Sequence, residues 1–247
     1  RAMEDKALLS TEVASGAEKA ELLIVIPAYN EAENIERVVN HLTANFPQYD
    51  YVVVNDGSRD ETAAICQRNG YNLLNLPVNL GLAGAFQAGL KYADKYGYQY
   101  AVQLDGDGQH RPEYLESMIK KMEEGYDIVI GSRFVGEKKP FTMRMLGSNL
   151  IEMAIRFTTG VNIKDPTSGM RMFSKRMIRE FASGLNYGPE PDTVSYLIRQ
   201  GARVAEVPVI MDERILGVSY LTPVNAMRYM LKMLISILLI QNFRKRR

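Results

Sequence analysis

The sequence has very little cysteine, almost no net charge and no hydrophobic run of membrane-spanning length. Only Cys66 among its 247 residues is a cysteine, which excludes an internal disulfide framework and suits a reducing compartment. The formal net charge of +1 gives no overall basic surface, so we expect no nucleic-acid partner. Residues 1–21 contain no apolar segment of the kind that a secretory signal needs, and we expect a loose N-terminal tail there.

What the sequence does contain is an alternation of strand and helix patterns. Residues 22–27 read LLIVIP, a continuous apolar run that is typical of a strand covered on both faces. Shorter apolar runs follow at residues 51–54 and 127–130, with helical patterns between them. This alternation predicts an α/β domain with a mostly parallel, Rossmann-like central sheet and helices on both faces.

Polar side chains directly follow the predicted strands. They are Glu31, Asp56, Asp105, Asp107 and Arg133. Because the carboxyl ends of parallel strands share one edge of a sheet, we expect these side chains to converge on one cleft. Each of them alone is equally well explained as a turn or helix-cap residue, but five at one edge favour a site.

The segment YQYAVQLDGDGQH at residues 98–110 contains the most informative of these positions. Asp105 and Asp107 follow a buried strand, and both cannot be buried without partners, so we expect Asp107 to face solvent. Such a pair is suited to hold a hard divalent cation through oxygen, and Gly106 lets a substrate approach closely. A simple polar turn is the alternative. His110 stands where an EF-hand loop needs glycine, and we interpret it as a loop-shaping residue.

The last segment, residues 223–247, predicts an amphipathic helix with a basic end. Its polar residues recur at steps of three and four: Asn225, Arg228, Lys232 and Ser236. The longest stretch without charge, residues 233–243, is shorter than the roughly 20 apolar residues that a membrane span requires. We expect this helix to lie on the cytoplasmic face of a membrane. Burial against the domain or against a partner is the alternative, and both arrangements are compatible with a homo-oligomer.

Six short motifs occur in order along the chain. They are PAYNE at 27–31, NDGS at 55–58, DGDGQH at 105–110, GSR at 131–133, DPTSGMR at 165–171 and RILGVSY at 214–220. Together they resemble family 2 glycosyltransferases of the GT-A fold, and in particular the polyprenyl-phosphate sugar transferases of the dolichol-phosphate mannose synthase type. The resemblance implies a GT-A domain over residues 22–222, with a nucleotide-sugar half at 22–135 and an acceptor half at 136–222.

The resemblance also implies a role for each matching residue. Contacts with the nucleoside are implied for Pro27, Tyr29, Glu31, Val54 and Asp56, of which Asp56 would recognise the base. Asp105, Asp107 and Gln109 would hold Mg²⁺ or Mn²⁺ against the donor diphosphate. Arg133 and Arg214 would neutralise phosphate oxygens, and Ser168 and Gly169 would line the path of the acceptor phosphate. Gly106, Glu190 and Tyr220 complete the expected substrate-binding residues.

The implied activity is metal-dependent, inverting transfer of a hexose from a nucleotide sugar to a polyprenyl phosphate, with Asp107, Arg133 and Arg214 as catalytic residues. A polyprenyl phosphate is anionic at neutral pH, because its second pKa is roughly 6, and it needs no general base. The mannose synthases carry lysines where Glu190 and Tyr220 stand here, which favours a UDP-sugar over GDP-mannose. Such transferases often work beside an integral membrane partner.

Two other functions remain open at this point. Transfer to a glycan hydroxyl, in the synthesis of cell-wall or surface polysaccharide, would require a general base, for which Glu190 and Asp192 are the obvious candidates. We interpret both carboxylates more simply as solvated charges at the N-terminus of a helix. The second alternative is a catalytically idle scaffold that binds a membrane or a partner, and the intact DGDGQH and GSR motifs argue against it.

Overall fold

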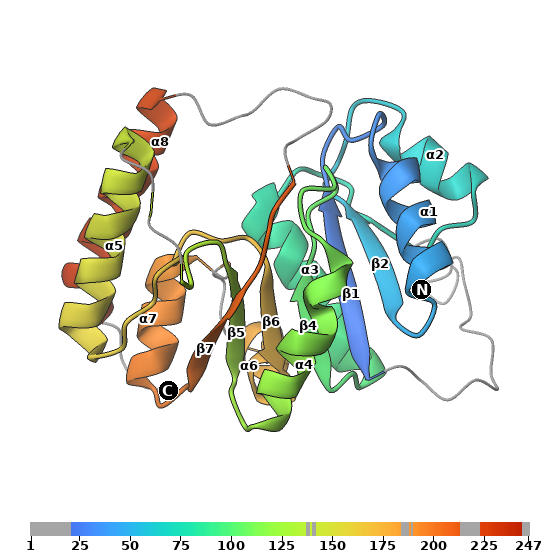
Figure 1. Ribbon diagram of the computed structural model, residues 1–247. Helices are drawn as coiled ribbons and strands as arrows, with labels where there is room; N and C mark the ends of the chain where they lie inside the picture. The colour runs from blue at the N-terminus through green and yellow to red at the C-terminus, as the bar shows by residue number, and fades with distance from the viewer. Residues whose placement is uncertain are drawn as a thin grey trace. The chain divides into compact units, whose positions relative to one another are not determined.

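The structure of the protein is a computed structural model, and it describes residues 21–136, 139, 142–183, 188, 190–212 and 223–243. Figure 1 shows how these residues form helices and strands. The expected N-terminal tail lies outside the described residues, apart from Glu21, and so does the basic end at residues 244–247.

The strands form one mixed sheet in the order β3-β2-β1-β4-β6-β5-β7. Their bounds are β1 Leu22–Ala28, β2 Asp50–Asn55, β3 Leu73–Asn75, β4 Tyr100–Gln103, β5 Ile128–Ser132, β6 Arg171–Ser174 and β7 Val204–Pro208. β1 pairs in parallel with β2 and β4, β2 with β3, and β5 with β7, whereas β6 runs antiparallel to β4. The predicted mostly parallel α/β sheet is therefore confirmed.

Helices alternate with these strands along the first two thirds of the chain and dominate the last third. Their bounds are α1 Ile35–Asn45, α2 Thr62–Arg68, α3 Gly81–Tyr96, α4 Leu115–Glu123, α5 Met143–Thr159, α6 Lys175–Ser183, α7 Pro191–Arg199 and α8 Pro223–Leu238, with short 3-10 helices at Pro112–Tyr114 and Ile240–Phe243. The chain divides into two compact units. The first comprises Arg1–Pro112, Met172–Gly188 and Asp212–Gly217, and the second comprises Glu113–Arg171, Pro189–Met211 and Val218–Arg247. The predicted nucleotide-sugar and acceptor halves are functional assignments, and they stay predictions.

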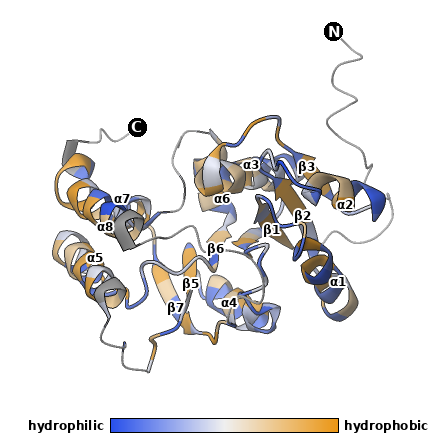
Figure 2. Cartoon of the chain, turned by 90° about the horizontal axis from the view of Figure 1, so that it is seen from above, coloured by the Kyte–Doolittle hydropathy of each residue, from blue (hydrophilic) through white to orange (hydrophobic). Residues whose placement is uncertain are grey.

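The core of the first unit lies on both sides of β1. Every residue of β1 is buried, as expected for a strand that helices cover on both faces. Figure 2 shows α1 on one side of β1 and β2, with α3 and α6 on the other. On the latter side the rings of Phe86, Phe173 and Phe181 pack in a row, with centroids 5.7 and 5.3 Å apart. α3 packs closely on β1 at Gly89, where a side-chain carbon would lie only 2.2 Å from Val25 and would not fit.

The second unit is built on β5 and β7, with α5, α7 and α8 packed against one another. All of β5 is buried. Thr142 caps the N-terminus of α5, where its side chain accepts a hydrogen bond from the amide of Met145, and Gly160 caps the C-terminus in the left-handed conformation. The expected C-terminal helix is present as α8, and it contacts α5 and α7.

Candidate functional site

The loops that follow β1, β2 and β4 gather the predicted acidic residues of the first unit. β1 pairs directly with both other strands and all three are parallel, so Glu31, Asp56, Asp105 and Asp107 follow neighbouring strand ends as predicted. A side-chain carbon on Gly106 would lie 3.1 Å from the carbonyl oxygen of Pro27 and 3.5 Å from the Cγ of Glu31. The loop after β4 therefore packs tightly on the end of β1, and a side chain at residue 106 would require the loop or the strand end to shift.

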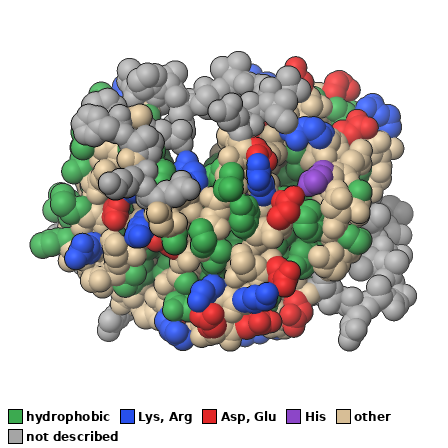
Figure 3. Space-filling model, viewed as in Figure 1, with side chains coloured by type: hydrophobic (Ala, Val, Ile, Leu, Met, Phe, Trp, Pro, Cys, Tyr) green, Lys and Arg blue, Asp and Glu red, His purple; other side chains and the backbone are tan. Residues whose placement is uncertain are grey.

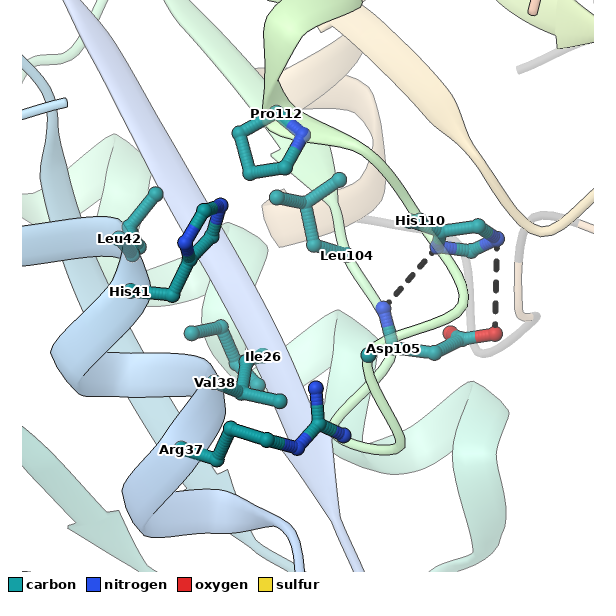
Figure 4. A pocket seen from close by; sticks show the side chains of 10 residues that line it. Ile26, Arg37, Val38, His41, Leu42, Leu104, Asp105, His110 and Pro112 are labelled. Atoms are coloured by element: carbon teal, nitrogen blue, oxygen red, sulfur yellow. Dashed lines mark hydrogen bonds and ion pairs between the residues drawn. The ribbon is translucent and has the colours of Figure 1, made fainter. Parts of the chain in front are cut away.

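His110 shapes the loop that contains Asp105 (Figure 4). Its Nδ1 accepts a hydrogen bond of 3.0 Å from the amide of Asp105, so in the neutral ring the proton is on Nε2. That Nε2 lies 3.6 Å from Oδ2 of Asp105, while Oδ1 accepts a bond of 2.8 Å from Nε2 of Gln103. The carboxylate of Asp105 is therefore oriented from two sides, and the prediction of a loop-shaping role for His110 is confirmed.

Asp107 is buried, with 3% of its surface exposed, and the expectation that it faces solvent is wrong. Its Oδ1 accepts a hydrogen bond of 3.0 Å from the amide of Gln109, and Arg37 donates to its carbonyl oxygen at 3.1 Å. The loop turns back on itself and supplies a donor to the carboxylate, which offsets part of the cost of burying it. The sequence pattern alone could not reveal the covering contact, because Arg37 lies 70 residues away.

Asp212 closes the end of this loop, and sequence reasoning missed it. Its amide donates to the carbonyl oxygen of Gln109 at 3.0 Å, and its own carbonyl accepts from Nε2 of Gln109 at 3.3 Å. Its carboxylate binds the guanidinium of Arg111, which holds the pKa of Asp212 below its usual range. No short-range pattern marks Asp212, which lies more than 100 residues after its partners.

The residues at this loop fit a hard divalent cation. Asp105 and Asp107 offer carboxylate oxygens, and the bond from Gln109 to Asp212 uses its amide nitrogen, not its amide oxygen. An all-oxygen set of this kind suits Mg²⁺ and Mn²⁺. Asp105 keeps 31% of its side chain exposed and is open to a ligand. Within the described part of the chain no group of three or more His, Cys, Asp or Glu residues is arranged to hold a metal. A cation here would therefore complete its shell with the amide and with ligand oxygens.

The predicted nucleoside residues lie at the ends of β1 and β2 or directly after them. Pro27 and Val54 are buried within these strands, and Tyr29 is half-buried. Asp56 is also buried, and its Oδ1 accepts a bond of 2.6 Å from the amide of Leu80. Asp56 is therefore held in place by the loop before α3. Contact of any of these residues with a nucleoside stays a prediction.

In the second unit the GSR and DPTSGMR motifs bind each other. Arg133 donates from Nε and Nη2 to Asp165 at 2.7 and 2.8 Å, and its amide donates to the same carboxylate. Asp165 is completely buried. Ser168 is also buried, and it donates from Oγ to the carbonyl of Gly131 at 2.6 Å. Sequence reasoning missed Asp165 as the partner of Arg133. The roles of Arg133, Ser168 and Gly169 at phosphates stay predictions.

Comparison with known proteins identifies the family. Residues 23–181 match the pattern of glycosyl transferase family 2. The chain belongs to this family. It is 32% identical over 223 residues to the polyprenol monophosphomannose synthase of Mycolicibacterium smegmatis, covering 85% of this chain and 84% of that protein. It is 31% identical over 210 residues to the undecaprenyl-phosphate mannosyltransferase of Micrococcus luteus, covering 80% and 86%.

Solved structures confirm the GT-A fold of this family 2 glycosyltransferase. Glucosyl-3-phosphoglycerate synthase from Mycobacterium tuberculosis, solved with Mn²⁺, UDP and glucosyl-3-phosphoglycerate, matches with a TM-score of 0.65 and 20% identity over 89% of this chain and 79% of that one. A mannosyltransferase from Pyrobaculum calidifontis, solved with GDP-Man and Mn²⁺, matches with a TM-score of 0.58 and 19% identity over 88% of this chain and 64% of that one.

In this transferase Glu190 and Asp192 join α7 to the C-terminal helix. Glu190 accepts a short hydrogen bond from the hydroxyl of Tyr229, and Asp192 accepts bonds from Ser236 at 2.6 Å and from Gln241 at 3.4 Å. Burial, followed by the charge of Glu190, raises the pKa of Tyr229. Both carboxylates lie at the N-terminus of α7, as interpreted, but they are half-buried and not simply solvated, because α8 and the 3-10 helix after it supply partners to both.

Two rows of exposed apolar side chains mark α5 and α8 of the transferase. On α5 they are Leu146, Leu150, Met153 and Phe157, and on α8 they are Met227, Leu231, Ile235 and Leu238. Hydrophobic side chains are visible along the left edge of Figure 3, where Figure 1 draws α5. The opposite side of α8 is buried at Met233 and Ile237. None of the helices in the described ranges has the length and hydropathy of a membrane span.

Arg214 and Tyr220 lie outside the described residues. Their proposed roles beside phosphates rest on the RILGVSY motif alone.

Proposed function

We propose that this family 2 glycosyltransferase transfers a hexose from a nucleotide sugar to a polyprenyl phosphate, with inversion at the anomeric carbon. The observation that carries the proposal is the loop after β4, where Asp105, Asp107 and Gln109 lie against the ends of neighbouring parallel strands. Such an edge is where α/β sheets bind nucleotides. The names of both bacterial relatives, which specify polyprenol or undecaprenyl phosphate, support the acceptor.

In this mechanism Asp105, Asp107 and Gln109 hold the metal, and Asp56 with Glu31 holds the nucleoside. A bound Mg²⁺ or Mn²⁺ ion supplies Lewis-acid stabilisation of the departing diphosphate. An oxygen of the acceptor phosphate forms a bond to C1 of the sugar as the bond from C1 to the diphosphate breaks. The acceptor oxygen carries no proton at neutral pH, so no side chain needs to remove one.

Arg133 and Arg214 are proposed to stabilise phosphate charge in the same reaction. The planar guanidinium matches pairs of phosphate oxygens. Asp165 uses the Nε and Nη2 of Arg133 and so fixes the direction of the side chain. Guanidinium has five N–H donors, so the bond pattern with Asp165 leaves donors on its other edge for a phosphate. Ser168 and Gly169, in the same turn as Asp165, are proposed to line the acceptor path.

The identity of the donor follows less directly from the residues. Loss of two lysines at Glu190 and Tyr220 favours a UDP-sugar, whereas the names of both relatives favour mannose. Glu190 accepts a hydrogen bond from the hydroxyl of Tyr229 on α8. The glutamate at this position is therefore explained by the packing of α8 as well as by the choice of donor. We therefore propose that the donor is either GDP-mannose or a UDP-hexose, and that the two are compared in the same assay.

The second candidate is transfer to a glycan hydroxyl. It would need a general base, for which Glu190 and Asp192 are the candidates. Both carboxylates already accept hydrogen bonds from α8 or from the 3-10 helix after it. This engagement disfavours a base role and supports an acceptor that is already ionised.

We also propose that the chain binds the cytoplasmic face of a membrane through residues 223–247. α8 exposes an apolar row together with Arg228 and Lys232, and residues 223–247 contain no acidic residue. An amphipathic surface of this kind suits anionic lipid headgroups. The apolar row on α5, which includes Phe157 at 85% exposure, supports the same role. An integral membrane partner or a second copy of the chain would cover the same residues.

A transfer assay tests the proposal. The protein is incubated with radiolabelled GDP-mannose, UDP-glucose or UDP-N-acetylglucosamine and with undecaprenyl phosphate, in Mn²⁺ or in excess EDTA. Label that enters the organic phase only with lipid phosphate and Mn²⁺ is the expected result. Label that enters only water-soluble glycan, or full turnover in EDTA, would overturn it.

A further inference from the structure

A chain of hydrogen bonds connects Glu31 to the loop after β4. Oε2 of Glu31 accepts from Nδ2 of Asn34 at 2.9 Å. Oδ1 of Asn34 accepts from Nη2 of Arg37 at 3.3 Å, and the same Nη2 donates to the carbonyl oxygen of Asp107 at 3.1 Å. Because Nη2 carries two hydrogens, both bonds form at once. All four residues belong to the first unit.

Asn34 is arranged for this connection and not for helix capping. It occupies the N-cap position of α1, where asparagine usually accepts a bond from the amide two or three residues later. Here its side chain makes no capping bond. It is 2% exposed, and its amide group joins Glu31 to Arg37.

Arg37 also covers the backbone of the metal loop. Gly108 has a φ of +80°, and a side-chain carbon on it would lie 2.8 Å from Nη2 and 3.0 Å from Nη1 of Arg37. Figure 4 shows Arg37 extending from α1 toward the loop of Asp105. The guanidinium thus fixes the peptide between Asp107 and Gly108, and the next amide, that of Gln109, donates back to the carboxylate of Asp107.

We infer that Arg37 and Asn34 are positioning residues that couple the nucleoside side of the site to its metal side. This inference rests on the proposed function. Glu31 and the metal loop are held by one network, so a nucleotide that orders Glu31 also orders Asp107, and a metal that orders Asp107 also orders Glu31. Such coupling is reciprocal: each ligand strengthens the other by the same factor.

The direction in which Mn²⁺ affinity changes when Arg37 is removed distinguishes a positioning role from simple electrostatic repulsion. Arg37 is a permanent positive charge close to a proposed cation site, and like charges repel. On charge alone, Arg37→Ala would make Mn²⁺ bind more tightly. Positioning predicts the opposite, because outer-shell partners of metal ligands typically contribute about 10-fold to 100-fold in affinity.

The test measures Mn²⁺ affinity from the electron paramagnetic resonance signal of free Mn²⁺, without nucleotide and with UDP or GDP. We expect Arg37→Ala to weaken Mn²⁺ binding about 10-fold. Arg37→Gln, which keeps N–H donors, should recover part of the loss. Asn34→Ala should reduce the factor by which nucleotide tightens Mn²⁺ binding. Arg68→Ala, at an exposed arginine of α2 in the same unit, is the matched control and should change nothing.

The outcomes separate this inference from the proposed function. If the wild-type protein binds Mn²⁺ and transfers sugar, but Arg37→Ala binds Mn²⁺ equally well or more tightly, the coupling is overturned and the transferase stands. If the wild-type protein binds no Mn²⁺ with either nucleotide, the proposed function fails first. Thermal melting of each variant identifies one that has lost its fold. In that case Arg37→Gln replaces Arg37→Ala in the same comparison.

Discussion

Asp105 of the first unit and two carboxylates of the second unit, Asp165 and Asp192, are in opposite situations. In the first, the loop after β4 keeps Asp105 open to a ligand, and Gln103 and His110 orient it. In the second, Asp165 is buried under Arg133, and Asp192 is bonded to the C-terminal helix. Asp105 of the first unit is thus open to a ligand, whereas Asp165 and Asp192 of the second unit join parts of the protein to one another.

The exposed surfaces differ in the same way. The second unit presents apolar rows on α5 and α8, where the hydrophobic effect favours contact with a lipid or a partner. The first unit has polar residues in the loops at its sheet edge, and its exposed large apolar side chains are confined to Val78, Leu80 and Leu82 among the described residues. This difference fits the proposals that the first unit binds the donor and that the second attaches the protein to a membrane or a partner.

The largest expected effect is on activity in the first unit. Asp107→Ala should lower kcat/KM for lipid-extractable product on the order of 10³-fold, because it removes a proposed metal ligand that stabilises the leaving group. Since Asp107 is buried, a moderate fall in melting temperature should accompany the loss.

Asp94→Asn, at an exposed aspartate on α3, is the control and should keep full activity. Asp105→Asn should resemble Asp107→Ala in activity with a smaller effect on stability. If Asp107→Ala or Asp105→Asn turned over substrate as fast as the wild type, the proposal that the first unit holds the metal and the donor would be overturned.

The next effect is on stability in the second unit. Asp165→Ala leaves the guanidinium of Arg133 without its buried partner and should lower the free energy of unfolding by about 3 kcal/mol. Urea denaturation measures it.

Glu116→Ala is the control. It breaks an ion pair with Lys120 in which both side chains are exposed, so it should lower the free energy of unfolding by less than about 1 kcal/mol. Equal losses in the two variants would contradict the view that Asp165 is a structural carboxylate.

A smaller effect is expected for membrane attachment. The double substitution Phe157→Ser and Leu231→Ser should lower binding to vesicles containing phosphatidylglycerol about tenfold, since each exposed apolar side chain that inserts contributes transfer energy. Co-sedimentation with the vesicles measures the binding. Because both side chains are exposed, the melting temperature of the double variant should equal that of the wild type.

Leu82→Ser, at an equally exposed leucine of the first unit, is the control for general hydrophobicity. If it reduces vesicle binding as much as the double variant, attachment does not belong to the second unit.

The smallest effect concerns alkaline pH in the first unit. Burial raises the pKa of the Cys66 thiol from 9.0 to about 11, so the folded state keeps a proton that the unfolded chain loses. This contribution to stability is complete below pH 9 and is lost as the pH rises from 9 to 11. At pH 10 the loss should be about 1 kcal/mol.

Urea denaturation between pH 8 and pH 10.5 measures the effect, and Cys66→Ala should show a shallower decline than the wild type. Parallel curves for the two proteins would exclude the thiol as the cause.

Local patterns predicted most of the fold and the position of the acidic loop after β4. Continuous apolar runs such as residues 22–27 became buried parallel strands, because a strand covered on both faces has to be apolar on both. Asp105 and Gln109 follow β4 as expected. In a parallel sheet the residues that come directly after a strand in the sequence lie at its carboxyl end, so their place can be read from the order of strands and helices. The exposed apolar row of α5 could not be predicted in this way, because its exposure depends on which elements pack against the other side of the helix.

Spacing along the chain was enough to predict where strands and helices alternate, which residues follow strand ends, and the oxygen-rich character of the loop after β4. Folding was needed to bring together side chains that are far apart in the chain: Arg37 with Asp107, Arg111 with Asp212, and Arg133 with Asp165. The physical reason is that a charged group is stabilised by whichever partner the packing of helices and strands brings within hydrogen-bond distance, and spacing along the chain does not encode that distance.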